Sequence, residues 1–227
     1  DELVGIDERI FQRLRAGIVA GSLKGVSLRQ ELERYAGGRD TPRGYDYLDV
    51  FVNGLLRLDT VPQETRQREP EMVFYQPTPV RAILELIEMV SITPEDIFYD
   101  LGSGLGQVCI LVHLLTGART HGIEFEPTFY NYSCQSAQRL NLPSVEFVNC
   151  DARQVNYADG TIFFMYTPFK GAMMDNVLQK IERESRGRAV RLCAYGKCAT
   201  QISNQPWLTL VAQHREGGDA LAIFERA

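Results

Sequence analysis

The sequence predicts an α/β fold: a mostly parallel sheet with helices on both faces, ending in an antiparallel hairpin and preceded by a helical segment. From about residue 75 onward, strand-like apolar runs alternate with helix-like runs, as a doubly wound sheet requires. The first of these strands leads into a helix through a Gly-rich turn at 102–106. Two strand-like runs, 207–214 and 220–225, lie on either side of a polar turn and predict the hairpin.

Residues 1–74 predict helices and loops. The stretches 37–44 and 62–70 are polar and contain Gly or Pro, so we expect loops there. Apolar residues recur at helical spacing in three groups: Ile10, Leu14 and Ile18; Leu28 and Leu32; and Leu48, Phe51, Val52, Leu55 and Leu56. We therefore expect an N-terminal helical cap subdomain over residues 1–74 that closes over the site, and a sheet domain over residues 75–227.

The segment Phe74–Pro79 stands directly before a helix-like run at 80–90. Thr78 is a typical N-cap residue and Pro79 a typical first residue of a helix, so the two predict where this helix begins. The helix does not require the aromatic pair Phe74 and Tyr75. We expect this pair to fold over a ligand at the edge of the sheet.

The turn Asp100-Leu101-Gly102-Ser103-Gly104-Leu105-Gly106 follows the strand-like run 97–99 and precedes an apolar helix pattern at 108–115. Glycine tolerates positive φ and has no Cβ, so such a turn lets the backbone approach a ligand closely. Nicotinamide-binding folds use G-x-G-x-x-G, but here the third glycine comes one residue early and Gln107 follows it. The pattern therefore favours S-adenosylmethionine (AdoMet) over a nicotinamide. The alternative is a tight strand-to-helix connection without a ligand.

Two further acidic residues follow predicted strands. Glu124 ends the strand 120–124 and lies 18 positions after Gly106 (124 − 106), near the spacing of about 20 expected for a carboxylate that binds ribose hydroxyls. Asp151 follows the strand 145–149 and precedes Ala152, where it would accept from the adenine amino group. The alternatives are a solvated charge for Glu124 and a helix cap for Asp151.

Composition agrees with one compact chain. The 227 residues are 44% hydrophobic, enough to bury a core for one α/β domain with an added subdomain. The net charge of −5 argues against nucleic acid held mainly through phosphate contacts. No apolar run approaches the roughly 18 residues that a membrane span needs, and no signal peptide is evident. The chain begins at Asp1 rather than Met, and the sequence does not tell whether an upstream segment is missing.

The five cysteines are an odd number and form no C-x-x-C pair. This composition predicts a reduced, cytoplasmic setting rather than a disulfide framework. His113, His121 and His214 show no metal-ligand spacing, so we expect them to be structural and expect no metal site.

The run 100–108 is similar to the AdoMet turn of the non-SET histone lysine methyltransferases, the disruptor-of-telomeric-silencing family, whose pattern is D-L-G-S-G-x-G-Q-V. Tyr75 and Thr78 correspond to the Tyr and Thr of that family's Y-G-E-T segment, and Tyr75 precedes Asp100 by 25 residues (100 − 75). The run 122–124 matches the family's G-V-E. Residues 75–79 also resemble the Y-x-P-T-P segment of lysine methyltransferases that act on an ATP-synthase subunit. The similarity covers roughly residues 75–170.

The resemblance implies a Rossmann-like class I methyltransferase fold with a seven-stranded sheet that ends in the hairpin. It implies AdoMet as cofactor and S-adenosylhomocysteine as product. The cofactor-binding residues would be Tyr75, Thr78, Asp100, Gly102, Ser103, Gly104, Gly106, Gln107, Glu124, Asp151 and Ala152.

The chain departs from the resemblance after its fourth predicted strand, 161–165. Tyr166-Thr167-Pro168-Phe169 stands where the histone enzymes have N-F-A-F and many amino-methylating enzymes have N-P-P-Y. The resemblance therefore does not extend to a histone substrate. We expect Tyr166, Tyr75 and Phe169 to act as catalytic residues that line the methyl-transfer channel, the alternative being that these aromatics are core.

These observations predict an AdoMet-dependent N-methyltransferase that modifies lysine on a protein. A methyltransferase for a small molecule is the first alternative, and an AdoMet-binding protein without catalysis the second. Oligomeric state is not predicted by any feature of the sequence.

Overall fold

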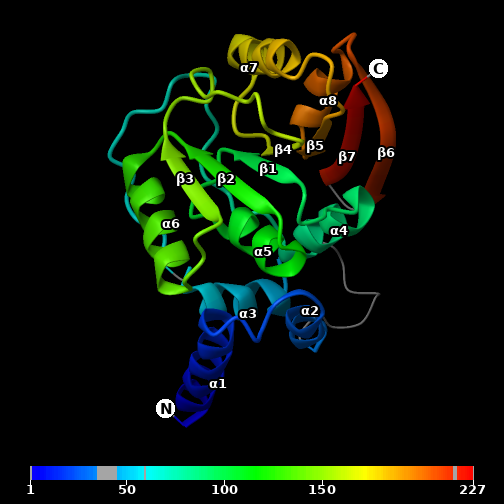
Figure 1. Cartoon of the computed structure of the whole chain (residues 1–227). Helices are drawn as coiled ribbons and strands as arrows, with labels where there is room; N and C mark the ends of the chain where they lie inside the picture. Colours follow the sequence, from blue (N-terminus) through cyan, green and yellow to red (C-terminus); the bar gives the residue numbers. More distant parts are fainter. Residues whose placement is uncertain (1, 35–44, 59, 217–218, 227) are drawn as a thin grey trace.

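The computed structural model describes residues 2–34, 45–58, 60–216 and 219–226, and a seven-stranded sheet lies at its centre (Figure 1). The strand order is β3-β2-β1-β4-β5-β7-β6. β1 to β5 are parallel, and β7 pairs antiparallel with both β5 and β6. The strands are β1 (Ile97–Leu101), β2 (Arg119–Glu124), β3 (Val145–Asn149), β4 (Ile162–Tyr166), β5 (Arg191–Tyr195), β6 (Leu208–Glu216) and β7 (Asp219–Arg226). The predicted fold class is confirmed.

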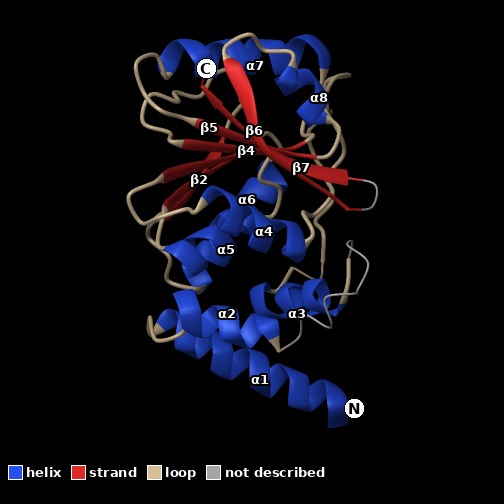
Figure 2. Cartoon of the chain, turned by 90° about the vertical axis from the view of Figure 1, so that its right-hand side faces the viewer, coloured by secondary structure: helices blue, strands red, loops and turns tan. Residues whose placement is uncertain are grey.

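The helices form layers on either side of the sheet (Figure 2). α4, α5 and α6 cover one face, α7 and α8 the other, and α1 to α3 lie beyond α4 to α6. Their bounds are α1 (Glu2–Val19), α2 (Gly25–Glu33), α3 (Tyr47–Leu56), α4 (Val80–Val90), α5 (Gln107–Thr116), α6 (Pro127–Arg139), α7 (Gly171–Glu184) and α8 (Cys198–Ser203).

The N-terminal helices share a hydrophobic core with the sheet domain. Leu28 of α2 and Leu48 of α3 are fully buried in the same cluster as Ile83 of α4 and Leu111 of α5. Burying such side chains is worth about 1.5–3 kcal/mol each. The helices α1 to α3 therefore pack on the layer formed by α4 to α6 (Figure 2). None of their described residues lines the pocket presented below, so the expectation that they close over the site is not met. The division at residue 74 stays a prediction.

The start of α4 corrects one detail. Its N-cap is Pro79 rather than Thr78, and no side chain of the cap accepts a hydrogen bond. The first amide of the helix is hydrogen-bonded by another element, because the carboxylate of Asp49 on α3 accepts from the Val80 amide at 2.9 Å. Thr78 is thus free to turn its buried side chain toward the edge of the sheet.

Of the two predicted loops, the structure describes 62–70 but not 37–44. The stretch 62–70 contains no helix or strand, as expected. The loop expected at 37–44 lies outside the described residues, as do residues 217–218 of the expected hairpin turn. β6 and β7 extend into the rest of that turn, pairing as far as Glu216 with Asp219. Among the described helices, none combines the length and apolar character needed to cross a membrane.

Candidate functional site

A pocket opens at the carboxyl edge of the parallel strands, where open α/β sheets bind ligands. Its volume is about 990 Å³ when the space open to solvent is counted. Its walls come from the connector before α4, from the Gly-rich turn and from the segments after β2, β3 and β4.

The Gly-rich turn is shaped by two close packings that leave no space for a side chain. Gly102 has a φ of +84°, and a Cβ there would lie 2.5 Å from Pro168. Gly104 has a φ of +53°, and a Cβ there would lie 2.2 Å from the ring of Tyr75. The segments before α4 and after β4 therefore lie directly against the turn, as predicted from their positions.

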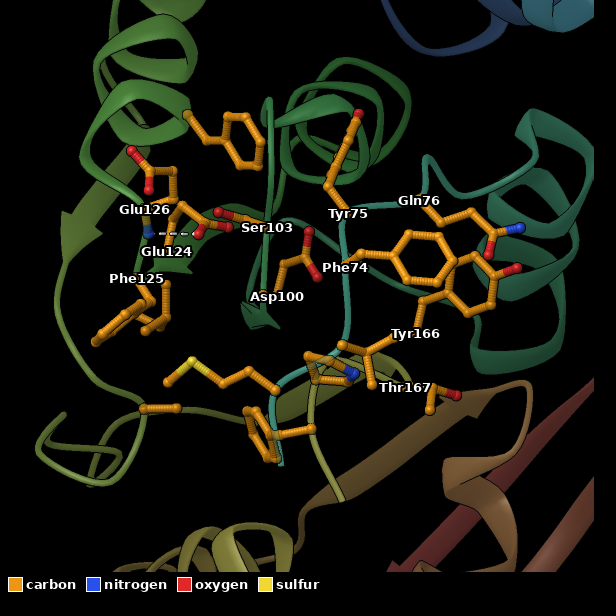
Figure 3. Close-up of a pocket in the computed structure, with 18 of the residues that line it drawn as sticks. Phe74, Tyr75, Gln76, Asp100, Ser103, Glu124, Phe125, Glu126, Tyr166 and Thr167 are labelled. Carbon is orange, nitrogen blue, oxygen red and sulfur yellow. Dashed lines mark hydrogen bonds between the residues drawn. The ribbon is translucent and has the colours of Figure 1, made fainter. Parts of the chain in front are cut away.

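Glu124 ties this turn to the next loop. One carboxylate oxygen accepts from the Gly104 amide at 2.7 Å. The other accepts from the Glu126 amide, also at 2.7 Å (Figure 3). Glu124 is buried, which raises the pKa of its carboxyl. Each oxygen has a second lone pair, so the geometry fits a carboxylate that also accepts from ribose hydroxyls.

Asp100 lies at the centre of the pocket (Figure 3). Burial and the nearby Glu124 raise the pKa of its carboxyl to about 8. In the described part of the chain no Lys or Arg pairs with it. A ligand that brings a positive charge, such as the ammonium of a bound amino acid, would favour the ionised form.

Two buried polar atoms in the same pocket also have no hydrogen-bond partner among the described residues. They are Ser103 Oγ and Gln107 Oε1, and both residues line the pocket. Buried polar groups are seldom left unpaired, so these atoms fit a polar ligand. Together with Asp100 they suit the amino-acid end of AdoMet.

The raised pKa of Asp100 carries a prediction about stability. A carboxyl whose pKa is higher in the folded than in the unfolded protein binds extra protons between the two values, so stability falls as pH rises from about 4 to about 8. We expect Asp100→Asn to flatten this decline in urea unfolding of the ligand-free protein. A decline of unchanged slope in Asp100→Asn would assign it to other groups.

Tyr75 packs against the Gly-rich turn at Gly104. Its ring packs against Phe129, with ring centroids 5.2 Å apart, and burial raises the pKa of its hydroxyl. The neighbouring Phe74 also lines the pocket but is 61% exposed. The predicted aromatic pair thus divides into one ring that supports the turn and one at the entrance.

The segment after β4 forms the other wall. Tyr166 and Phe169 both line the pocket. Thr167 between them has a φ of +41°, a strained conformation for a residue other than glycine. Phe169 is only 4% exposed and also packs in the core beneath α7. It is therefore both a core residue, as the alternative assignment held, and part of the pocket wall.

Most predicted site residues meet in this pocket. Those that line it are Tyr75, Thr78, Asp100, Gly102, Ser103, Gln107, Glu124, Ala152, Tyr166 and Phe169. Gly104, Gly106 and Asp151 do not. The Asp151 carboxylate accepts from the backbone and guanidinium of Arg153, so it is already paired in this structure. Its role toward adenine stays a prediction.

The connector before α4 contributes a wall that the sequence did not reveal. The Thr65 hydroxyl and the Arg66 amide both donate to the carboxylate of Glu126, at 2.7 and 2.8 Å. The Arg66 guanidinium lies 4.5 Å from the ring centroid of Phe125. Residues 64–68 therefore cross the end of the pocket next to β2.

The described residues contain no cluster of His, Cys, Asp and Glu that could hold a metal ion. All five cysteines are free thiols. The cytoplasmic location stays a prediction.

Comparison with known proteins agrees with this site. The family model of the histone methylation protein DOT1 matches residues 72–162, which include the segment 72–79 before α4, the turn and β1 to β3. No curated protein sequence matches the chain significantly.

Several solved structures share the fold. An RNA methyltransferase from Salinibacter ruber, in complex with S-adenosyl-L-homocysteine, is 21% identical with a TM-score of 0.56, over 66% of this chain and 94% of that one. A precorrin-6y C5,15-methyltransferase from Geobacter metallireducens is 11% identical with a TM-score of 0.53, over 68% and 92%. One of these proteins is named for RNA and the other for precorrin-6y, so the shared fold does not identify a methyl acceptor.

The fold and the family match together make the chain an AdoMet-dependent methyltransferase with the class I architecture.

Proposed function

We propose that this AdoMet-dependent methyltransferase transfers its methyl group to the side-chain nitrogen of a lysine on a protein. The observation that carries the proposal is the shape of the pocket. Beyond Asp100 it continues to a second end, where the aromatic rings of Phe74 and Tyr166 lie (Figure 3). The partial match to a histone methylation family supports the choice of lysine.

One end of the pocket would bind the cofactor and the other the acceptor. Glu124 would hold the ribose, and Asp100, Ser103 and Gln107 would hold the amino-acid part of the cofactor. The cofactor supplies a methyl group already activated by the adjacent sulfonium. The residues of the chain therefore need to align the two reactants, exclude water and admit an uncharged amine.

The acceptor end fits an amine that has lost its proton. The new N–C bond forms as the C–S bond breaks, and the electron pair of that bond stays on sulfur. A lysine ammonium has to release its proton first, and desolvation between aromatic rings favours the neutral amine. Tyr166 and Phe169 would supply these walls, with the Tyr166 hydroxyl orienting the nitrogen.

A methyl-transfer assay tests the proposal. The protein is incubated with tritiated-methyl AdoMet and a cell lysate, and the labelled protein is hydrolysed and analysed for methylated lysine. We expect label in protein, recovered as methyl-lysine. Label in the small-molecule fraction would instead support a metabolite as acceptor, and no label would support a protein that binds AdoMet without catalysis.

A further inference from the structure

We propose that Asp219, at the start of β7, is a positioning residue whose charge attracts a cationic acceptor to the end of the pocket lined by Tyr166, the residue to which it is hydrogen-bonded. The proposal rests on the function proposed above and deepens it. The acceptor class it implies is an amine that approaches as its positively charged ammonium. Asp219 does not line the pocket itself, so it does not touch the reacting atoms.

The hairpin brings Asp219 to the acceptor end of the pocket. The Tyr166 hydroxyl donates to Asp219 Oδ2 at 3.3 Å. Both residues also lie close to Gly196, where a Cβ would be 3.2 Å from the Tyr166 ring and 3.4 Å from Asp219 Oδ1. Tyr195 packs on the other side, with its ring centroid 4.7 Å from that of Tyr166. The carboxylate therefore lies next to a pocket residue, to which it is hydrogen-bonded.

A second tyrosine belongs to the same group. The Tyr45 hydroxyl donates to the carbonyl of Pro77, a residue that lines the pocket, and Tyr45 remains 52% exposed. Burial, the Asp219 carboxylate and Tyr45 all raise the pKa of Tyr166, which places the three residues within electrostatic reach of one another. An acidic group among aromatic rings is suited to a cation, because the ring faces add to the attraction.

Two arginines that line the pocket, Arg66 and Arg68, lie on the connector before α4. Arg66 lies against Phe125, at the end opposite Tyr166 and Thr167 (Figure 3). Arg68 pairs with Glu64 on the same connector, at 2.9 Å.

Among the residues whose side chains the structure describes, no Lys or Arg forms an ion pair with Asp219. Asp100, Glu124 and Glu126 line the pocket, in the part that the cofactor would cover. Asp219 is the carboxylate next to the end left for the acceptor, so a cationic side chain is attracted there once the cofactor is bound.

The test uses n-butylammonium, which has the amine and alkyl chain of a lysine side chain, and n-butanol as its neutral counterpart. Binding to the protein saturated with S-adenosylhomocysteine is measured by ligand-observed NMR. We expect n-butylammonium to bind more tightly than n-butanol. Asp219→Asn should weaken n-butylammonium binding about fivefold to tenfold at low salt, with a smaller difference at high salt because exposed charges are screened.

Two variants complete the design. Asp219→Glu retains the charge and should restore the preference for n-butylammonium. Asp159→Asn is the matched control, because Asp159 accepts from the Tyr99 hydroxyl at 2.8 Å in a similar pair away from the pocket. It should leave the preference unchanged. Calorimetry with S-adenosylhomocysteine checks that each variant is folded.

The outcomes separate this proposal from the proposed function. Equal binding of n-butylammonium by wild type and a folded Asp219→Asn, or no preference over n-butanol in wild type, would overturn the role of Asp219. If the preference depends on Asp219 but no lysate protein is labelled, the cation site stands and protein lysine is wrong. With a labelled protein in hand, Asp219→Asn should raise KM and leave kcat nearly unchanged.

Discussion

Replacing Glu124 by alanine is expected to weaken AdoMet binding about ten- to a hundredfold. The change removes a charged acceptor for the ribose hydroxyls, and charge-assisted hydrogen bonds contribute about 1.5–3 kcal/mol. It also frees the amides of Gly104 and Glu126, which the carboxylate holds at 2.7 Å. Both effects act in the same direction, because a loosened turn is less well arranged for the cofactor. Isothermal titration calorimetry measures the loss.

Two further variants identify the cause. Glu124→Gln keeps one acceptor oxygen without the charge, so its affinity should lie between those of wild type and Glu124→Ala. Glu146→Ala removes a carboxylate from the neighbouring strand β3, where the side chain is 60% exposed, and should bind AdoMet normally. An unchanged affinity in folded Glu124→Ala would refute the placement of the ribose at this residue.

The turn and its acidic partner were predictable because their determinants are local. Gly102, Gly104 and Gly106 all have positive φ, a conformation that glycine tolerates and that three glycines in one turn predict. Glu124 follows from the length of one βα unit, which the spacing of apolar residues reveals. Short-range patterns of this kind define the parallel part of the sheet and one side of the pocket.

Long-range contacts explain what the sequence did not reveal. The amide of Val80 is satisfied by Asp49, 31 residues away, so the expected cap at Thr78 is not needed. Tyr166 and Asp219 are 53 residues apart and meet only because β7 inserts next to β5. No spacing rule predicts which side chains a hairpin brings to a pocket.

Asp151 shows a different limit. Its position after β3 was predicted, but the direction of its side chain depends on competition between partners. Arg153, two residues further on, takes both carboxylate oxygens, and Arg153 also pairs with Glu69 of the connector at 2.6 Å. The sequence places both charges but does not determine whether they bind each other or a ligand.

Tyr166→Phe is expected to lower kcat about ten- to a hundredfold while AdoMet affinity stays unchanged. The substitution keeps the ring, which packs against Tyr195, and removes only the hydroxyl that would orient the acceptor nitrogen. A small misplacement of a reacting atom suffices for a loss of this size. The hydroxyl lies at the acceptor end, away from Glu124 and Asp100, so the cofactor should bind as before. Single-turnover methyl transfer and calorimetry measure the two quantities separately.

Tyr99→Phe is the control for losing a hydroxyl that is paired with a carboxylate. The Tyr99 hydroxyl donates to Asp159, and Tyr99 does not line the pocket, so its removal should leave kcat unchanged. Equal losses of rate and cofactor affinity in Tyr166→Phe would mean that Tyr166 supports the fold or the cofactor instead. An unchanged rate would exclude the hydroxyl from catalysis. A fall in kcat in Tyr166→Phe together with a rise in KM in Asp219→Asn would separate the two roles. The Tyr166 hydroxyl would then orient the acceptor, and Asp219 would attract it.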